Sequence, residues 1–306
     1  MRPVWLAILS LPLFGGAIPP VPEGANATVQ MIVTAKGRQG QSIPVLNSGD
    51  FSVREGETQL HVTEVKPMRE ENAGLELFLL VDDSSASSLG SQLSDLKQFI
   101  LAQPSTTLVG VGYMSNGGVV TSQRLTADHA HAAARLRLPF SMAAPSPYLS
   151  LTDLVKHWPG AAGSSARREV VMVSSGIDPL GGLGSIDPYL DNAIQDAHRA
   201  GVIVYTIYAP AAERAGYAYF SSFWGQNHLA QLAEETGGEY YMLGLQPAVS
   251  FTPYLDEIAG HMANQYRVTF EIHPEKKAGY RSVSLHTEVA GANLAHASEV
   301  YVPAGR

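Results

Sequence analysis

Residues 76–88 read ELFLLVDDSSASS, an apolar run that ends in two aspartates followed by four serines within five positions. The apolar half, together with Leu75, is typical of a strand that is buried on both faces of a sheet. In open parallel sheets, ligands bind outside the carboxyl ends of the strands. The stretch therefore predicts a cluster of oxygen atoms at a ligand-binding edge, where these oxygens could serve as metal ligands, as helix caps or as a nucleophile.

Apolar runs alternate with amphipathic segments along the chain from Leu75 to Gln265. This alternation predicts an α/β fold with a Rossmann-like, doubly wound, mainly parallel sheet. A hairpin over residues 108–124 predicts one antiparallel edge strand. Short alternating strands before and after this region predict small flanking β elements at residues 28–70 and 266–306.

Composition excludes several classes of function. The 306 residues carry a net charge of −8, and only 16% of them are charged. Because no basic stretch is extended, nucleic acid is not an expected partner. The absence of cysteine excludes disulfide scaffolds, thiolate zinc sites and cysteine nucleophiles.

The N-terminus predicts export. Residues 1–17 contain Arg2, an apolar run from Val4 to Phe14, and small residues at Gly15 and Ala17, which is the pattern of a signal peptide. A proline-rich leader at 18–27 is expected to be disordered. The apolar run is too short for a membrane helix and no second one approaches that length, so no integral span is expected in a secreted or periplasmic mature chain.

Two strand ends are rich in oxygen atoms, namely VDDSSASS from Val81 and VSSGID from Val173. Ser146 and Ser150 flank the start of a predicted helix at Tyr148 that could reach the same edge. Hydroxyls and carboxylates together suit magnesium, manganese or calcium rather than zinc or copper. Taken singly, each junction also fits a helix cap, because Ser and Asp oxygens accept hydrogen bonds from free backbone N–H groups.

The order of these elements resembles a von Willebrand factor A-type domain over residues 75–265. That family carries D-x-S-x-S after its first strand, T-D-G after a later strand and T-G-G-x-Y-Y before its last strand. This sequence has DDSSAS, SSG and TGGEYY at those places. The flanks resemble a secreted bacterial subgroup, the acidobacterial-type VWFA-related proteins, whose L-x-x-x-D-F-x-V-x-E-x-G pattern is matched except that Gly56 comes one position early. We therefore expect a domain of this type at 71–265.

The resemblance implies a metal-ion-dependent adhesion site that usually holds magnesium. Alignment on the strand end gives Asp82 and Ser84, and leaves Ala86 where the third oxygen is expected. A shift by one residue gives Asp83, Ser85 and Ser87, which restores the motif but lengthens the strand. We favour Asp82, because a one-residue slip reverses the direction of every side chain.

The remaining ligands are also incomplete. The family's threonine ligand corresponds best to Ser146, and the aspartate of T-D-G falls on Ser175, so that Asp178 is the nearest substitute. The resemblance thus implies a degenerate site made of Asp82, Ser84, Ser146 and Asp178, with Mg²⁺, Mn²⁺ or Ca²⁺ as its cofactor. Lost ligands lower the affinity for a hard cation, which needs several oxygens.

Three functions remain open. The first is a secreted, non-enzymatic protein-binding or adhesion module that engages an unknown protein ligand through this edge. The second is a metal-independent structural protein of the cell envelope. The third is a serine hydrolase with its nucleophile among Ser84–Ser88, although no spacing identifies its histidine base. The aromatic stretch Tyr217–Trp224 lacks helical periodicity and predicts a loop, either packed on the core or exposed to a protein or glycan partner.

Overall fold

The computed structural model describes residues 26–37, 44–85, 87–140, 144, 146–182, 184–211, 219–242, 244 and 248–305. The predicted signal peptide at 1–17 and nearly all of the leader at 18–27 lie outside this part of the chain. Within it, no helix is both long enough and apolar enough to cross a membrane.

One six-stranded sheet follows the order β6-β5-β4-β7-β8-β9. All neighbouring strands in it are parallel except β5 and β6, which form the predicted antiparallel hairpin at the edge. The predicted α/β fold and its antiparallel edge strand are therefore confirmed. The strands are β4 (Leu75–Asp82), β5 (Thr107–Ser115), β6 (Gly118–Thr126), β7 (Arg167–Ser174), β8 (Val202–Tyr208) and β9 (Tyr240–Tyr241).

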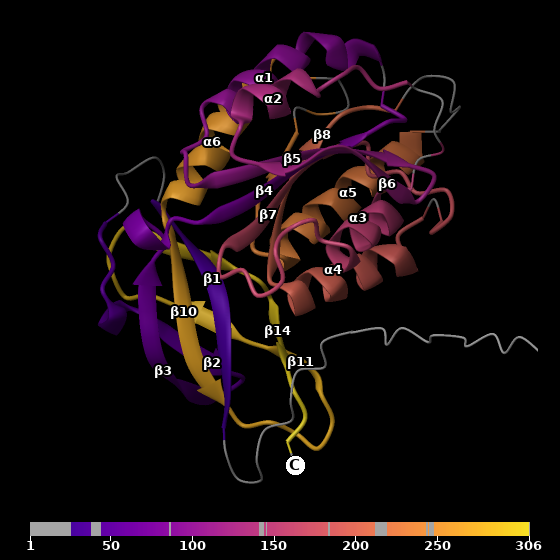
Figure 1. Cartoon of the computed structure of the whole chain (residues 1–306). Coiled ribbons are helices and arrows are strands. Elements are labelled where there is room, and N and C mark those ends of the chain that lie inside the picture. The colour runs from indigo at the N-terminus through magenta and orange to yellow at the C-terminus, as the bar shows by residue number, and fades with distance from the viewer. Residues whose placement is uncertain are drawn as a thin grey trace, which may run out of the picture.

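Helices cover both faces of this sheet (Figure 1). One face carries α1 (Leu93–Leu101), α2 (His129–Ala134) and α6 (Thr252–Ala263), and the other carries α3 (Pro147–Lys156), α4 (Pro188–Ala200) and α5 (Tyr219–Glu235). Alternate residues of β4 enter the two cores, Leu77 and Leu79 on one side and Phe78 and Leu80 on the other. This double burial explains why the strand is apolar from Leu77 to Val81.

The ring of Phe78 lies against two glycines of β5, Gly110 and Gly112, which pair with Phe78 and Leu80. A Cβ atom at Gly110 would lie 2.5 Å from Phe78 Cδ2, and one at Gly112 would lie 2.9 Å from Phe78 Cε1. The alternating glycines in VGVGY thus make room for an aromatic ring in the centre of the sheet.

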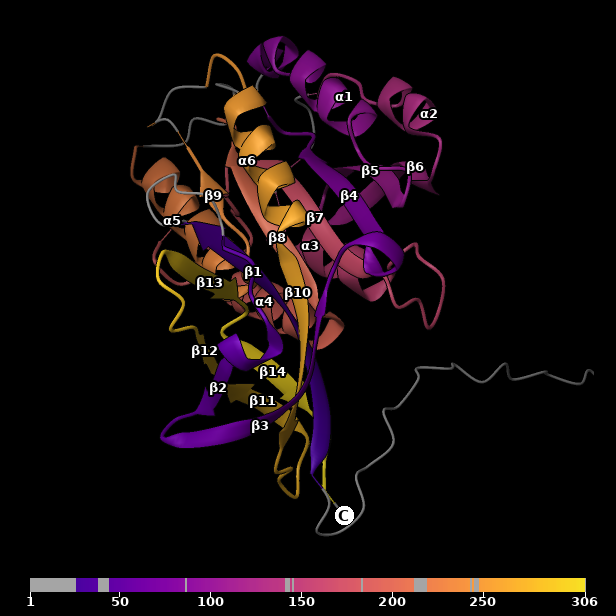
Figure 2. The same ribbon diagram turned by 90° about the vertical axis from the view of Figure 1, so that its left-hand side faces the viewer.

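The segments on either side of the α/β region form a second sheet, with the order β12-β2-β3-β10-β1-β13 and only antiparallel pairs. The sequence predicts two separate flanking elements, but β1 lies between β10 and β13, so N-terminal and C-terminal strands share one core (Figure 2). Its strands are β1 (Ala27–Gly37), β2 (Ser52–Glu55), β3 (Thr58–Pro67), β10 (Gln265–Ile272), β12 (Ser284–His286) and β13 (Ala292–His296). Strands β11 (Gly279–Ser282) and β14 (Glu299–Val302) form a separate pair, and the short 3₁₀ helices are η2 (Ser48–Asp50), η3 (Glu70–Asn72) and η4 (Ser87–Ser91).

The chain passes between the two sheets twice, from β3 to β4 and from α6 to β10 (Figure 2). Arg167, which is buried, connects both passages, because its Nη1 donates to Met68 O at 3.1 Å and its Nη2 donates to Met262 O at 3.0 Å. Its Nε donates to Glu169 Oε1 at 3.0 Å. One guanidinium therefore links both connections to the start of β7.

The loop prediction for Tyr217–Trp224 is wrong from Tyr219 onward, because α5 begins at Tyr219. Tyr217 lies outside the described residues. Among the helix residues whose side chains are described, the first buried ones are Ser221 and Gly225, and a Cβ at Gly225 would lie 2.5 Å from Ser175 O. Because small residues, not apolar ones, form the first part of the buried stripe, the hydrophobic pattern does not show the helical period there.

Candidate functional site

The order of strands reverses between β4 and β7, because the chain adds β5 and β6 on one side of β4 and β7 to β9 on the other. Such a switch point is where ligands bind in open α/β sheets. Val81 pairs with Val173, so Asp82 and Ser174 end two adjacent strands at this point.

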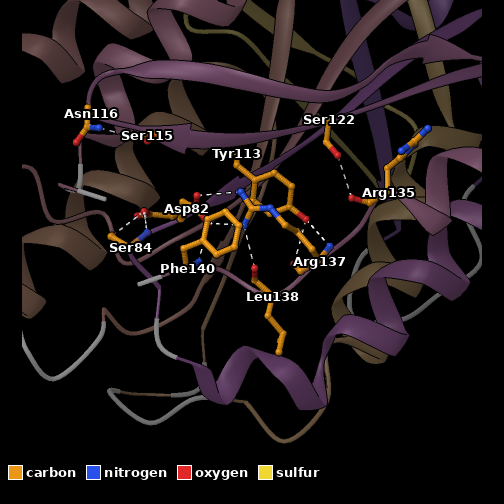
Figure 3. A network of polar contacts seen from close by, with 11 residues as sticks. Asp82, Ser84, Tyr113, Ser115, Asn116, Ser122, Arg135, Arg137, Leu138 and Phe140 are labelled. Atoms are coloured by element: carbon orange, nitrogen blue, oxygen red, sulfur yellow. Dashed lines mark hydrogen bonds and ion pairs between the residues drawn. The ribbon is translucent and has the colours of Figure 1, made fainter. Parts of the chain in front are cut away.

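Asp82 is buried, with 1% of its surface exposed, and both of its carboxylate oxygens accept hydrogen bonds, of which Figure 3 shows those from Ser84. Oδ1 accepts hydrogen bonds from Ser84 N at 2.9 Å and Ser84 Oγ at 2.6 Å. Oδ2 accepts one from Ser174 Oγ at 2.8 Å. Burial raises the pKa of Asp82 above its usual value, while these hydrogen bonds act in the opposite direction.

Asp83 has a different partner, the guanidinium of Arg137, whose Nη1 and Nη2 donate to the two carboxylate oxygens at 2.7 and 2.9 Å. Phe140 N donates to the same carboxylate at 2.9 Å. The guanidinium lies between the rings of Tyr113 and Phe140, 3.8 Å from each centroid (Figure 3). Asp83 therefore holds the segment that follows α2 against the end of β4.

Ser146 and Asp178 form a second pair at the same edge. Ser146 precedes α3, and its Oγ donates to Asp178 Oδ2 at 3.2 Å. Asp178 Oδ1 accepts from Leu180 N and Gly181 N at 3.0 and 3.2 Å, which closes the loop after β7. Burial also raises the pKa of Asp178.

The predicted residues thus meet in two hydroxyl–carboxylate pairs, Ser84 with Asp82 and Ser146 with Asp178. Tyr148 belongs to the first turn of α3, and its OH donates to Gly176 O, in the loop after β7, at 3.0 Å. Burial is the largest cause of the raised pKa of Tyr148, and the charges of Asp178 and Asp82 raise this pKa further. Both carboxylates are therefore within electrostatic reach of one tyrosine.

The other predicted oxygens have local roles or cannot be placed. Ser175 is fully buried, and its Oγ accepts a hydrogen bond from Ile177 N at 3.4 Å, as in a serine turn. Ser85 is fully buried. Ala86 and the side chain of Ser87 lie outside the described part of the structure.

Two residues of the site, Ser174 and Arg137, are missing from the sequence prediction. Ser174 could have been found, because it is the last residue of the strand next to Asp82. Arg137 gives no local signal, since 54 residues separate it from Asp83. Among the described residues, no three or more histidine, aspartate or glutamate side chains are grouped so that they could hold a metal ion. Any cation here would therefore depend on hydroxyl oxygens as well.

Many of the exposed apolar side chains lie on segments at the same edge of the parallel sheet. Of the eleven large apolar side chains that are exposed in the described part of the chain, seven lie on segments that follow or flank the carboxyl ends of the parallel strands. They are Leu138, Phe140, Leu180, Ile186, Phe223, Met242 and Val249, and we call them the apolar ring. Phe140, Ile186 and Val249 are 67%, 78% and 88% exposed.

No protein-family model and no curated protein matches this sequence. The similar solved structures include von Willebrand factor A domains. BatB from Bacteroides thetaiotaomicron is 14% identical, with 62% of this chain and 99% of that chain covered and a TM-score of 0.47. The vWF domain of the type V pili tip protein Mfa5 from Porphyromonas gingivalis is 11% identical, with coverages of 61% and 94% and a TM-score of 0.43.

The SpRpn10 VWA domain is 10% identical, with 60% of this chain and 93% of that chain covered and a TM-score of 0.37. At such identities and TM-scores the similarity says nothing about what this chain binds.

Proposed function

We propose that this chain is a secreted or periplasmic, non-enzymatic module of the von Willebrand A type that binds a protein partner through the carboxyl edge of its parallel sheet. The observation that carries this proposal is that the seven exposed residues of the apolar ring and the oxygen pairs at the switch point belong to the same, carboxyl edge of the sheet. Large exposed apolar patches with polar groups nearby mark interaction sites in soluble proteins.

Residue types at this edge support a protein as the partner. Interfaces between proteins are enriched in aromatic residues, methionine and arginine relative to other surfaces. Arg137 is stacked on exposed Phe140, and Phe223 and Met242 belong to the same ring. Because the guanidinium is already held by Asp83, little side-chain entropy would be lost when a partner covers it.

A divalent cation, Mg²⁺ or else Mn²⁺ or Ca²⁺, is part of this proposal. Ser84 and Ser146 each direct their hydroxyl hydrogen to a carboxylate, so the lone pairs of both oxygens remain available to a hard cation. The raised pKa values of Asp82 and Asp178 reflect buried negative charge that a cation would offset. When bound, the cation would supply a coordination position for a carboxylate of the partner.

The contacts of Asp83 favour one alignment of the motif. Its two oxygens accept hydrogen bonds from Arg137 and from Phe140 N, so this carboxylate already has a structural role. That supports Asp82 and Ser84 as ligands in preference to Asp83, Ser85 and Ser87.

The serine hydrolase gains no support from the geometry. The Ser84 hydroxyl donates to Asp82, and no hydrogen bond joins Ser84 to a histidine within the described ranges. A serine nucleophile instead needs a base that accepts its proton. Absence of labelling by a fluorophosphonate probe is the expected result.

A photo-crosslinking residue at selected positions tests where the partner binds. Ile186 is in the apolar ring, Leu108 is at the opposite end of the parallel sheet, and Val45 is on the segment that connects strands β1 and β2 of the second sheet. We expect a single protein adduct in the producing cells from position 186 and none from 108 or 45. An adduct from position 45 alone would instead favour envelope assembly through the flanking strands. Adducts from no position in the ring would refute binding at this edge.

A further inference from the structure

A cavity of about 310 Å³ lies at the other end of the parallel sheet, between the two parts of the molecule. Its walls come from the C-terminal end of α4, the starts of β7 and β8, and strands β1, β10 and β14. Figure 1 shows α4 beside β14 at this junction. Junctions between domains are common places for small-molecule sites, and this volume is at the lower end of their usual range.

One wall of the cavity is positive. Arg267 of β10 lines it, and its Nη2 donates to Ser165 O. Among the described residues, no carboxylate lies within ion-pair distance of Arg267, whereas Arg167 and Arg168 beside it have Glu169 and Glu76. Burial, and then the charge of Arg167, lowers the pKa of Arg267. The Arg267 guanidinium is partly buried and lies outside ion-pair distance of any described carboxylate, although the more distant charge of Glu64 acts on it, so it is a favourable place for a carboxylate.

Another part of the wall is a pair of acceptors. The His198 side chain is 1% exposed, and its Nε2 lies 2.7 Å from Glu235 O. A carbonyl oxygen can only accept, so Nε2 carries the hydrogen and Nδ1 of the neutral ring is an acceptor. Nδ1 has no hydrogen-bond partner, and it lies 3.8 Å from Glu299 Oε2.

This spacing fits an ammonium group. Hydrogen bonds from nitrogen to nitrogen or oxygen are about 2.7–3.2 Å long. One ammonium nitrogen can therefore reach both His198 Nδ1 and Glu299 Oε2. The end of α4, at Gly201, lines the same cavity, and the C-terminus of a helix also favours a cation.

From these two sets of groups we infer that the cavity binds a small zwitterion, a free α-amino acid, with its carboxylate on Arg267 and its ammonium between His198 and Glu299. Arg267 and Glu299 come from the C-terminal strands, and His198 comes from α4 of the α/β region. The ligand would therefore contact both parts of the molecule and stabilise their junction. This site does not depend on the partner proposed for the edge at Asp82.

Matched small molecules test the inference. L-alanine, L-leucine and L-glutamate are titrated into the full mature chain by calorimetry, with thermal unfolding measured in parallel. Propionate lacks the ammonium of alanine, and ethylamine lacks its carboxylate. We expect at least one amino acid to bind at a single site and to raise the unfolding temperature, and neither half-molecule to do so at the same concentration. Binding of none of the three amino acids, or equal binding of propionate or ethylamine, would overturn the inference.

Variants then locate the binding. We expect Arg267→Met and Glu299→Gln each to lower the affinity for the amino acid by about 10- to 100-fold. This is the usual effect of losing a hydrogen bond to a charged group. Glu288→Gln, at an exposed position outside the cavity, is the matched control and should bind as the wild type does. Glu299 is on a short two-stranded sheet, so its variant reports on binding even where Arg267→Met affects folding. Unchanged affinity in Glu299→Gln would place the ligand elsewhere.

Discussion

Replacing Asp82 by asparagine separates its role in folding from its role as a cation ligand. In Asp82→Asn, the remaining oxygen can still accept from Ser84 N and Ser84 Oγ, and the new amide can donate to Ser174 Oγ. The metal-free variant should therefore lose at most about 1 kcal/mol of stability. Asp82→Ala, in contrast, leaves three buried donors without an acceptor, at about 1–3 kcal/mol each, so its total loss should be about 3 kcal/mol or more.

A bound cation stabilises the fold further, and this stabilisation needs the carboxylate. A ligand at 100 times its dissociation constant stabilises the folded state by about 2.7 kcal/mol. For a domain the size of the α/β region, this corresponds to an increase in the unfolding temperature of about 5–10 °C. Asp82→Asn keeps the hydrogen bonds but removes the charge, so this increase should disappear while the fold remains.

Thermal unfolding with chelator and with saturating magnesium or manganese measures both effects. Wild-type protein should show the increase, Asp82→Asn should not, and Asp256→Asn, which removes an exposed carboxylate from α6, should behave as the wild type does. An equal increase in Asp82→Asn would place the cation elsewhere. No increase in the wild type with magnesium, manganese or calcium would show that the edge is metal-free, and calorimetry on the same samples would then register no binding.

Three further predictions concern stability. Burial raises the folded-state pKa of Asp82, so metal-free protein should lose stability as pH rises above the usual aspartate pKa of 3.8, and urea titrations should show a smaller loss in Asp82→Asn. Burial lowers the pKa of His261 to about 4, so the free energy of unfolding should fall as the pH is lowered from 6.5 to 4, by up to about 1.4 kcal/mol per pH unit. The same fall in His261→Phe would contradict this. Gly110→Ala should cost about 1–3 kcal/mol in urea unfolding, because its Cβ meets Phe78, whereas Gly49→Ala, with open space around it, should not destabilise; equal effects would refute the packing argument.

The parts of the fold that sequence predicts are those set by local pattern. Uninterrupted apolar runs such as Leu77–Val81 indicate strands covered on both faces, and they alternate with helices, which identifies an α/β sheet. The hydrogen bond between Asp82 and Ser84 is equally local, since the two residues are two positions apart. The structure also joins Ser146 to Asp178, 32 residues away, as the resemblance implied by placing both in one site.

Other features depend on pairings that no local pattern encodes. The period of β1 identifies a strand, but nothing in it specifies β10, more than two hundred residues away, as its partner. The contact between Arg137 and Asp83 depends on where the segment after α2 returns to the sheet. The start of α5 has no apolar signature because Ser221 and Gly225 fill its buried stripe, so close packing of backbone replaces the apolar side chains that reveal a helix.

The position of Arg167 determines how the molecule responds to a pull. A partner bound at the apolar ring would pull on one end of the parallel sheet, whereas the second sheet lies beyond the opposite end (Figure 1). Both covalent connections between the sheets meet the same guanidinium, through Met68 O and Met262 O. Tension therefore reaches the second sheet through fastened connections rather than through a flexible tether. Bending the two halves apart requires breaking both buried hydrogen bonds, in addition to other contacts between the halves such as that of Ser298 N with Glu235 O.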